Sequence, residues 1–208
     1  MFKNIIFDWS GVIKDSVRSH VWVVSRMMEL LGGGNKISFE ELKEKWEQPY
    51  LKFWNKYYPD LTLQEEQDLY YRVISQKEYP ESDVYPGMPD LIKNLKAQGV
   101  RMSVVSSDPT ERLLRETKEF GLENIFDDVI TNAHDKSEGV DGLIEKYNFK
   151  KEETVFIGDS NHEVEVGKQV GIKTIAVTWG FSAEEKLKLT NPDYLVHNIK
   201  ELEKILLL

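Results

Sequence analysis

Short apolar runs rich in Val and Ile recur along the chain, and we expect each to form a β-strand. They are the segments 4–8, 101–107, 127–131, 154–159, 173–178 and 193–197. Apolar residues recur at helical spacing in the segments between them, at 88–99, 109–121, 139–148 and 163–171, several of which end on a glycine suited to a helix C-cap. Strands that alternate with helices predict a parallel sheet covered on both faces. The expected fold class is therefore α/β, with a doubly wound, Rossmann-like sheet.

The stretch 15–84 departs from this alternation. It contains no convincing strand and is typical of about four helices rich in aromatic residues, after which "YPGMP" at 85–89 marks the return to the core pattern. We therefore predict a discontinuous core domain, residues 1–14 and 85–208, with residues 15–84 inserted as a small helical domain. The aromatic residues of the insert are expected to form chiefly a hydrophobic core of their own: Trp22, Trp46, Trp54, Tyr57, Tyr58, Tyr70 and Tyr71.

Composition narrows the classes of function. The 208 residues include no cysteine, which excludes a disulfide scaffold or zinc-thiolate site and favours an intracellular location. A net charge of −9 disfavours nucleic-acid binding, since phosphate backbones require a basic face. The sequence shows no signal peptide and no run of about 18 uncharged apolar residues that would span a membrane. We expect a soluble, cytoplasmic monomer or homodimer.

Polar residues follow several of the predicted strands. Asp8 follows "IIF", Ser106 follows "SVV" and Asp159 follows "VFIG", while Lys136 lies just after the strand 127–131 in the loop "NAHDKSEG". Ligands of an open parallel sheet bind beyond the carboxyl ends of its strands. We therefore expect two carboxylates, a hydroxyl and an ammonium group to converge on one crevice.

This set of groups suits phosphoryl transfer. An ionised Asp8 can attack phosphorus and form an aspartyl-phosphate. A Mg²⁺ ion held by Asp8, Asp159, a backbone carbonyl and waters would offset the repulsion between carboxylate and phosphate. Lys136 would neutralise the phosphate and keep Asp8 ionised.

The remaining phosphoryl oxygens need hydrogen-bond donors. The Ser106 hydroxyl and the backbone amides after Asp8 and Ser106, the latter belonging to Ser107, would bind them. Gly11 lets the chain turn closely around the ligand.

The same residues carry a resemblance to a known family. "FDWSGVIKDS", "SVVSSD", the lysine of "HDKSEG" and "FIGDSNHEVEVGKQVGIKTIAVTWG" are similar, in order, to the four motifs of the haloacid dehalogenase-like hydrolases. The helical insert after the first motif resembles the type 1 cap of that family. The resemblance implies a Mg²⁺-dependent hydrolase, usually a phosphatase, whose substrate is a small phosphorylated molecule. It implies Asp8 as nucleophile, Ser106 and Lys136 on the phosphate and Asp159 on the metal.

Two further positions are interpreted through the resemblance. Glu163 stands where the family often has a second acidic residue, which holds the metal through water or assists Asp159. Ser10 stands where phosphatases of the family usually carry an aspartate that protonates the leaving group, a contribution of about 10²–10⁴ in rate. The Ser10 hydroxyl is a poor acid or base, although its backbone carbonyl can still bind the metal.

The substitution at Ser10 leaves several functions open. The enzyme acts on substrates with good leaving groups, or holds a longer-lived phospho-aspartate, or is catalytically weak and serves as a regulatory module that binds phosphate or metal. A dehalogenase-type carbon–halogen hydrolase is a further alternative, because that branch also lacks this aspartate.

Each candidate residue also has a purely structural interpretation. Ser106 is a possible N-cap for the helix near Pro109, in competition with Asp108. Lys136 is a possible solvated loop lysine, and Glu163 is an acid of the kind that helix N-termini favour in any protein. His162 is expected to be exposed or to cap a helix.

Overall fold

A parallel sheet forms the centre of the molecule, as the computed structural model shows for residues 2–34 and 36–207. Its strands are β1 (Asn4–Phe7), β2 (Arg101–Val105), β3 (Asp128–Ile130), β4 (Thr154–Gly158), β5 (Lys173–Val177) and β6 (Tyr194–Val196). Their spatial order is β3-β2-β1-β4-β5-β6, and every neighbouring pair is parallel. The predicted doubly wound α/β fold is confirmed. The direction of winding reverses between the central strands β1 and β4, which is where such folds bind ligands.

Helices cover both faces of the sheet because successive strand residues point to opposite sides. On one face, Ile5 and Phe7 of β1 pack with α5 (Met88–Ala97), α6 (Thr110–Glu119) and α10 (Ile199–Leu207). On the other face, Ile6 packs with α7 (Lys136–Tyr147) and α8 (Asn161–Val170). The short helices η1 (Lys151–Glu153) and α9 (Glu184–Leu189) precede β4 and β6.

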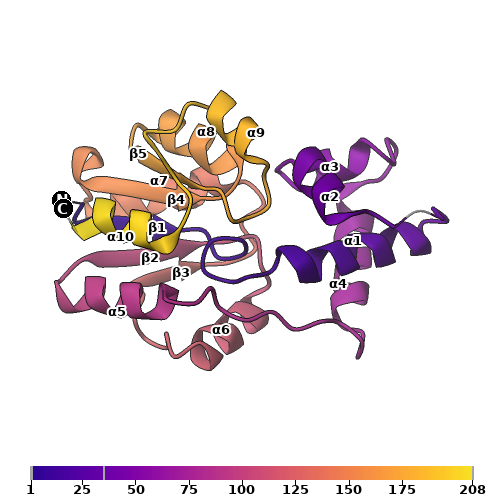
Figure 1. The fold of residues 1–208 in the computed structure, drawn as a ribbon, viewed down its shortest axis with the longest axis horizontal. Helices are drawn as coiled ribbons and strands as arrows, with labels where there is room; N and C mark the ends of the chain where they lie inside the picture. The colour runs from indigo at the N-terminus through magenta and orange to yellow at the C-terminus, as the bar shows by residue number, and fades with distance from the viewer. Residues whose placement is uncertain (1, 35, 208) are drawn as a thin grey trace.

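The insert consists of helices that lie beside the sheet rather than on it (Figure 1). They are α1 (Val17–Leu30), α2 (Phe39–Lys45), α3 (Leu51–Asn55) and α4 (Leu63–Ile74). These helices enclose a separate apolar cluster that includes Trp46, Phe53 and Trp54, in agreement with the expected aromatic core. An antiparallel bridge between Lys14 and Val84 brings together the points where the chain leaves and re-enters the core. These features support the proposed division into core residues 1–14 and 85–208 and cap residues 15–84.

Side chains of the cap contact the loops at the carboxyl ends of the strands. The Trp46 ring stacks on Phe181 with centroids 4.4 Å apart. The Lys43 ammonium donates hydrogen bonds to the carbonyls of Thr178 and Gly180, at 3.1 and 2.6 Å. The cap therefore covers the edge of the sheet at which the candidate residues lie.

Within residues 2–34 and 36–207, no helix is long and apolar enough to cross a membrane.

Candidate active site

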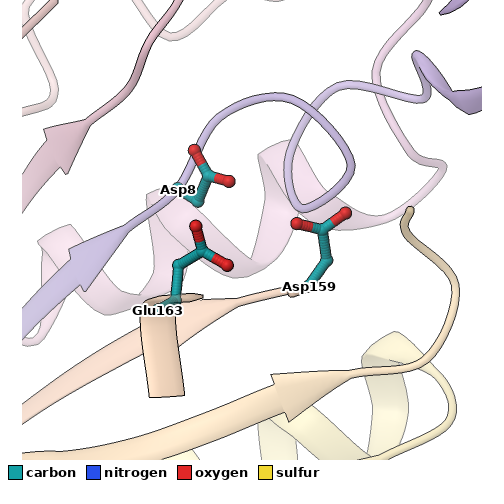
Figure 2. A group of neighbouring side chains, drawn as sticks. All are labelled: Asp8, Asp159 and Glu163. Carbon is teal, nitrogen blue, oxygen red and sulfur yellow. The ribbon is translucent and has the colours of Figure 1, made fainter. Parts of the chain in front are cut away.

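Three carboxylates meet at the carboxyl ends of the two central strands (Figure 2). Asp8 directly follows β1, Asp159 directly follows β4, and Glu163 lies in the first turn of α8. One oxygen from each lies within 4.8 Å of the others, and all three side chains are buried. The parallel pairing of β1 with β4 produces this meeting, because it aligns Phe7 with Ile157 and so places both strand ends side by side.

Lys136 supplies the positive charge at the centre of this cluster. Its ammonium lies 2.8 Å from Asp8 Oδ1 and 2.7 Å from Glu163 Oε1. The side chain is fully buried, so a solvated loop lysine is the wrong interpretation. Lys136 also begins α7 rather than lying in a loop, and Asp135 caps that helix by accepting a hydrogen bond from the Ser137 amide at 3.0 Å.

Glu163 is held by two different partners. One oxygen accepts from Lys136, while Oε2 accepts from the Ser160 backbone N–H at 2.9 Å and from its hydroxyl at 2.5 Å. Ser160 and Glu163 thus form a capping box at the start of α8. This arrangement fixes the carboxylate beside Asp8, with both of its oxygens already hydrogen-bonded. A contact between Glu163 and a metal through water stays a prediction.

The two carboxylate oxygens of Asp159 have different surroundings. Oδ2 accepts from the Phe181 backbone N–H at 2.6 Å, whereas Oδ1 is buried and has no hydrogen-bond partner among the residues that the structure describes. Burial, followed by the negative charge of Asp8, raises the pKa of Asp159 well above its usual value. A buried, unpaired carboxylate oxygen beside two further carboxylates is the oxygen-only donor set that suits Mg²⁺. The residues present therefore fit a divalent cation.

Two glycines, Gly11 and Gly180, allow the backbone to lie close to the Asp159 side chain. A Cβ atom at Gly11 would lie 2.0 Å from Asp159 Oδ2, and one at Gly180 would lie 2.1 Å from the same atom. Gly11 has a φ of +84°, a conformation that other residues rarely adopt. A side chain at either position would displace Asp159.

The ionisation of Asp8 depends on positive charge. Its Oδ1 accepts from the Trp9 backbone N–H at 2.7 Å. Burial raises the pKa of Asp8 to about 7, even though Lys136 lowers it. Lys136 therefore only partly offsets the effect of burial, and a bound cation would lower the pKa of Asp8 further.

Ser10 and Ser106 share one acceptor, Asp108. The Ser10 hydroxyl donates to Asp108 Oδ2 at 2.8 Å and the Ser106 hydroxyl to the same oxygen at 2.7 Å. Burial alone would raise the pKa of Asp108, but Lys14 and the two serine hydroxyls hold it below its usual value. Neither Ser106 nor Asp108 caps α6, whose N-cap is Pro109 without a side-chain hydrogen bond. The capping interpretation of Ser106 is therefore wrong.

A cavity of about 70 Å³ opens beside Asp8 and lies between core and cap. The core contributes Asp8, Ser10, Ser107, Asp108, Pro109, His134 and Phe181, and the cap contributes His20, Trp46, Gln48, Tyr50, Glu66, Gln67, Tyr70 and Tyr71. Sequence reasoning missed Glu66 and His20. The sequence could have indicated Glu66, because its spacing from Tyr70 and Val73 places all three residues on the same face of a helix.

The sequence predicted that His162 would be exposed or would cap a helix, and the structure buries it. It is only 7% exposed, and its Nε2 lies 3.5 Å from the backbone N of Lys136 as an acceptor. Packing between α7 and α8 buries it, which a pattern in one helix does not reveal.

Comparison with known proteins fits this geometry. A family model described as haloacid dehalogenase-like hydrolase matches residues 5–177. The chain belongs to this family. The resemblance seen in the four motifs is thus confirmed.

Several named relatives share part of the sequence. A pyrophosphatase PpaX from Halalkalibacterium halodurans is 29% identical over 123 residues, which is 57% of each chain. A pyrophosphatase PpaX from Listeria innocua is 28% identical over 66% of each chain, and a phosphoglycolate phosphatase from Synechococcus elongatus is 26% identical over 59% of each. The matched segment thus spans less than two thirds of the length of these curated relatives.

Solved structures confirm the fold over the whole chain. A structure described as a predicted phosphatase from Clostridium acetobutylicum superposes with a TM-score of 0.86 at 24% identity, covering 100% of this chain and 99% of that one. A CbbY structure from Rhodobacter sphaeroides, in complex with phosphate, has a TM-score of 0.75 at 18% identity and covers 97% of this chain and 96% of that one.

Proposed function

We propose that this protein is a Mg²⁺-dependent phosphatase that hydrolyses a small phosphorylated metabolite through an aspartyl-phosphate on Asp8. The observation that carries the proposal is the meeting of Asp8, Asp159 and Lys136 around one buried point. Family membership and the phosphatase names of the relatives support the same reaction class. A cytoplasmic location, and a monomeric or homodimeric state, remain predictions.

The cation would be held by Asp8, by the unpaired Oδ1 of Asp159 and by the backbone carbonyl of Ser10, with Glu163 acting through water. When bound, Mg²⁺ neutralises phosphate charge and lowers the repulsion that an anionic nucleophile meets.

The protein's own groups bind and orient the phosphate. Asp8 carries the attacking oxygen, and Lys136 pairs with it and with the incoming phosphoryl group. Ser106 and the backbone N–H of Ser107 would bind phosphoryl oxygens, while the turn at Gly11 lets the backbone approach them. The cap excludes water from the cavity and surrounds the leaving group.

The leaving group receives less help than in most phosphatases of the family. The Ser10 hydroxyl donates to Asp108 and cannot protonate an alkoxide well. This observation favours substrates with good leaving groups, such as acyl phosphates. It also supports the second candidate function, a regulatory module that binds metal or phosphate with little turnover.

The relatives offer two specific substrates to try. Pyrophosphate and phosphoglycolate are what the named relatives act on, and both are small phosphorylated molecules. Both are therefore candidate substrates for this protein.

Steady-state phosphate release tests the proposal. We expect turnover of acetyl phosphate or para-nitrophenyl phosphate with Mg²⁺, loss of that turnover with a chelator, and abolition by Asp8→Asn. The exposed Asp68 provides the matched control, because Asp68→Asn makes the same chemical change outside the cavity. If neither substrate is turned over and Ser10→Asp restores hydrolysis, the regulatory function replaces the enzymatic one. Halide release without added metal would instead indicate a dehalogenase.

A further inference from the structure

Acidic side chains line the cavity beside Asp8. Its lining residues include three acids, Asp8, Glu66 and Asp108, and among the described residues that line it there is no lysine or arginine. His20 is neutral because burial lowers its pKa to about 3, and burial likewise lowers the pKa of His134. An anionic leaving group would therefore meet no counter-charge here.

Among the described residues, Glu66 has no partner, unlike the other two acids. Asp8 pairs with Lys136, and Asp108 accepts hydrogen bonds from two serines. Glu66 is 3% exposed, and within residues 2–34 and 36–207 no hydrogen bond or ion pair reaches its carboxylate. A buried carboxylate without a partner is costly, and it is retained in a ligand cavity where a ligand supplies the missing charge.

Aromatic rings form most of the remaining wall on the cap side. Tyr50 lies with its ring centroid 5.3 Å from that of Trp46 and 6.1 Å from that of Tyr70. The Glu66 charge is close enough to contribute to the raised pKa of Tyr50, after burial. Aromatic faces attract cations, so rings next to a carboxylate form a site for an amine rather than for an acid.

We propose that Glu66 and the rings around it select a phosphorylated compound whose leaving group carries an amine, with the ammonium group at Glu66 and the phosphoryl group at Asp8. The cavity volume of about 70 Å³ limits the amine to a short chain. The inference rests on the proposed phosphatase function for the placement of the phosphoryl group, and it adds the chemistry of the leaving group.

Equilibrium binding of three phosphonates of matched size tests the inference without requiring turnover. The probes are 2-aminoethylphosphonate, 2-hydroxyethylphosphonate and phosphonoacetate, titrated calorimetrically into the full-length protein with Mg²⁺. Each has two carbons beyond phosphorus: the first two differ only in a terminal ammonium or hydroxyl group, and in phosphonoacetate the second carbon is a carboxylate. We expect the aminoethyl compound to bind at least tenfold more tightly than the hydroxyethyl compound, and phosphonoacetate to bind most weakly.

Two variants test whether the preference for an amine depends on Glu66 itself rather than on the negative charge of the protein as a whole. Glu66→Gln should weaken aminoethylphosphonate at least tenfold and change the hydroxyethyl compound less than threefold. Asp68→Asn, an exposed change on the same helix, should change neither. Circular dichroism tests whether each variant is folded. If Glu66→Gln does not fold, the relative affinities of the three phosphonates for the wild-type protein decide whether the site prefers an amine.

The outcomes for the two proposals are distinct. Binding of the hydroxyethyl or carboxylate probe as tightly as the amine, or an unchanged preference in folded Glu66→Gln, overturns the amine selection and leaves phosphatase activity standing. No phosphate release from acetyl phosphate, together with a clear amine preference, removes the phosphatase function while supporting the amine site.

Discussion

Replacing Lys136 with methionine tests the charge balance of the buried cluster. The lysine side chain is 1% exposed, and its ammonium lies within 2.8 Å of one carboxylate oxygen each of Asp8 and Glu163, which are 4% and 1% exposed. Removing one partner of a buried ion pair typically costs about 3–5 kcal/mol, because the remaining charge is left without compensation. A protein of this size loses about 2–4 °C of melting temperature per kcal/mol, so the expected decrease is about 6–20 °C.

The assay is urea and thermal unfolding at pH 8 without divalent cations, followed by circular dichroism. Lys146→Met is the matched control, because Lys146 makes an equally short ion pair, 2.7 Å to Asp128, but is 59% exposed. A surface pair of this kind contributes about 0–1 kcal/mol. If the Lys136 variant is no less stable than the Lys146 variant, the buried ammonium does not balance the cluster and the reasoning is refuted.

Three further predictions concern Glu116, Ser10 and Glu66. Glu116→Ala should cost about 3–5 kcal/mol in urea unfolding, because buried Glu116 accepts from Lys14 at 2.6 Å, Trp9 Nε1 at 2.8 Å and Arg112 at 3.0 Å; a loss below about 1 kcal/mol, typical of an exposed ion pair, would contradict this. Ser10→Asp should speed the hydrolysis of alkyl phosphates at least about tenfold, because it restores a general acid. Acetyl phosphate should change little in the same phosphate-release assay. Equal effects on both substrates would contradict the idea that Ser10 limits protonation of the leaving group. Burial raises the pKa of Glu66 from its ordinary 4.5 to about 7. The contribution of Glu66 to the free energy of unfolding is therefore greatest below pH 4.5 and falls by about 3 kcal/mol as the pH rises through 7. Glu66→Gln should therefore gain stability relative to wild type across that range, and a pH-independent difference in unfolding free energy would contradict the assignment.

Much of the fold was predictable because it depends on local pattern. The apolar runs and the helical segments between them are each visible in the sequence, and their alternation predicts that the strands run parallel. Asp8 and Asp159 were identifiable for the same reason, since each residue directly follows a buried strand. The start of α7 was misplaced because its capping residue, Asp135, lies in a polar stretch that resembles a loop.

The cavity was less predictable because its walls come from distant segments. Glu66 lies on α4 and Phe181 follows β5, and only the docking of cap on core brings them near Asp8. The shared acceptor of Ser10 and Ser106 was hidden as well, because Asp108 is a plausible helix cap by sequence and its hydrogen bonds span 98 residues of chain. Side-chain direction in the insert is set by tertiary packing, which periodicity does not specify.

Covalent labelling of the protein during turnover tests whether Asp8 forms an aspartyl-phosphate. Wild-type protein mixed with acetyl phosphate and Mg²⁺ is quenched in acid within the first turnover, digested and analysed by mass spectrometry. We expect one added phosphoryl group on Asp8, which is lost on longer incubation and absent from Asp8→Asn. Phosphate release without label on this residue, or a phosphoryl group on any other side chain, would contradict it.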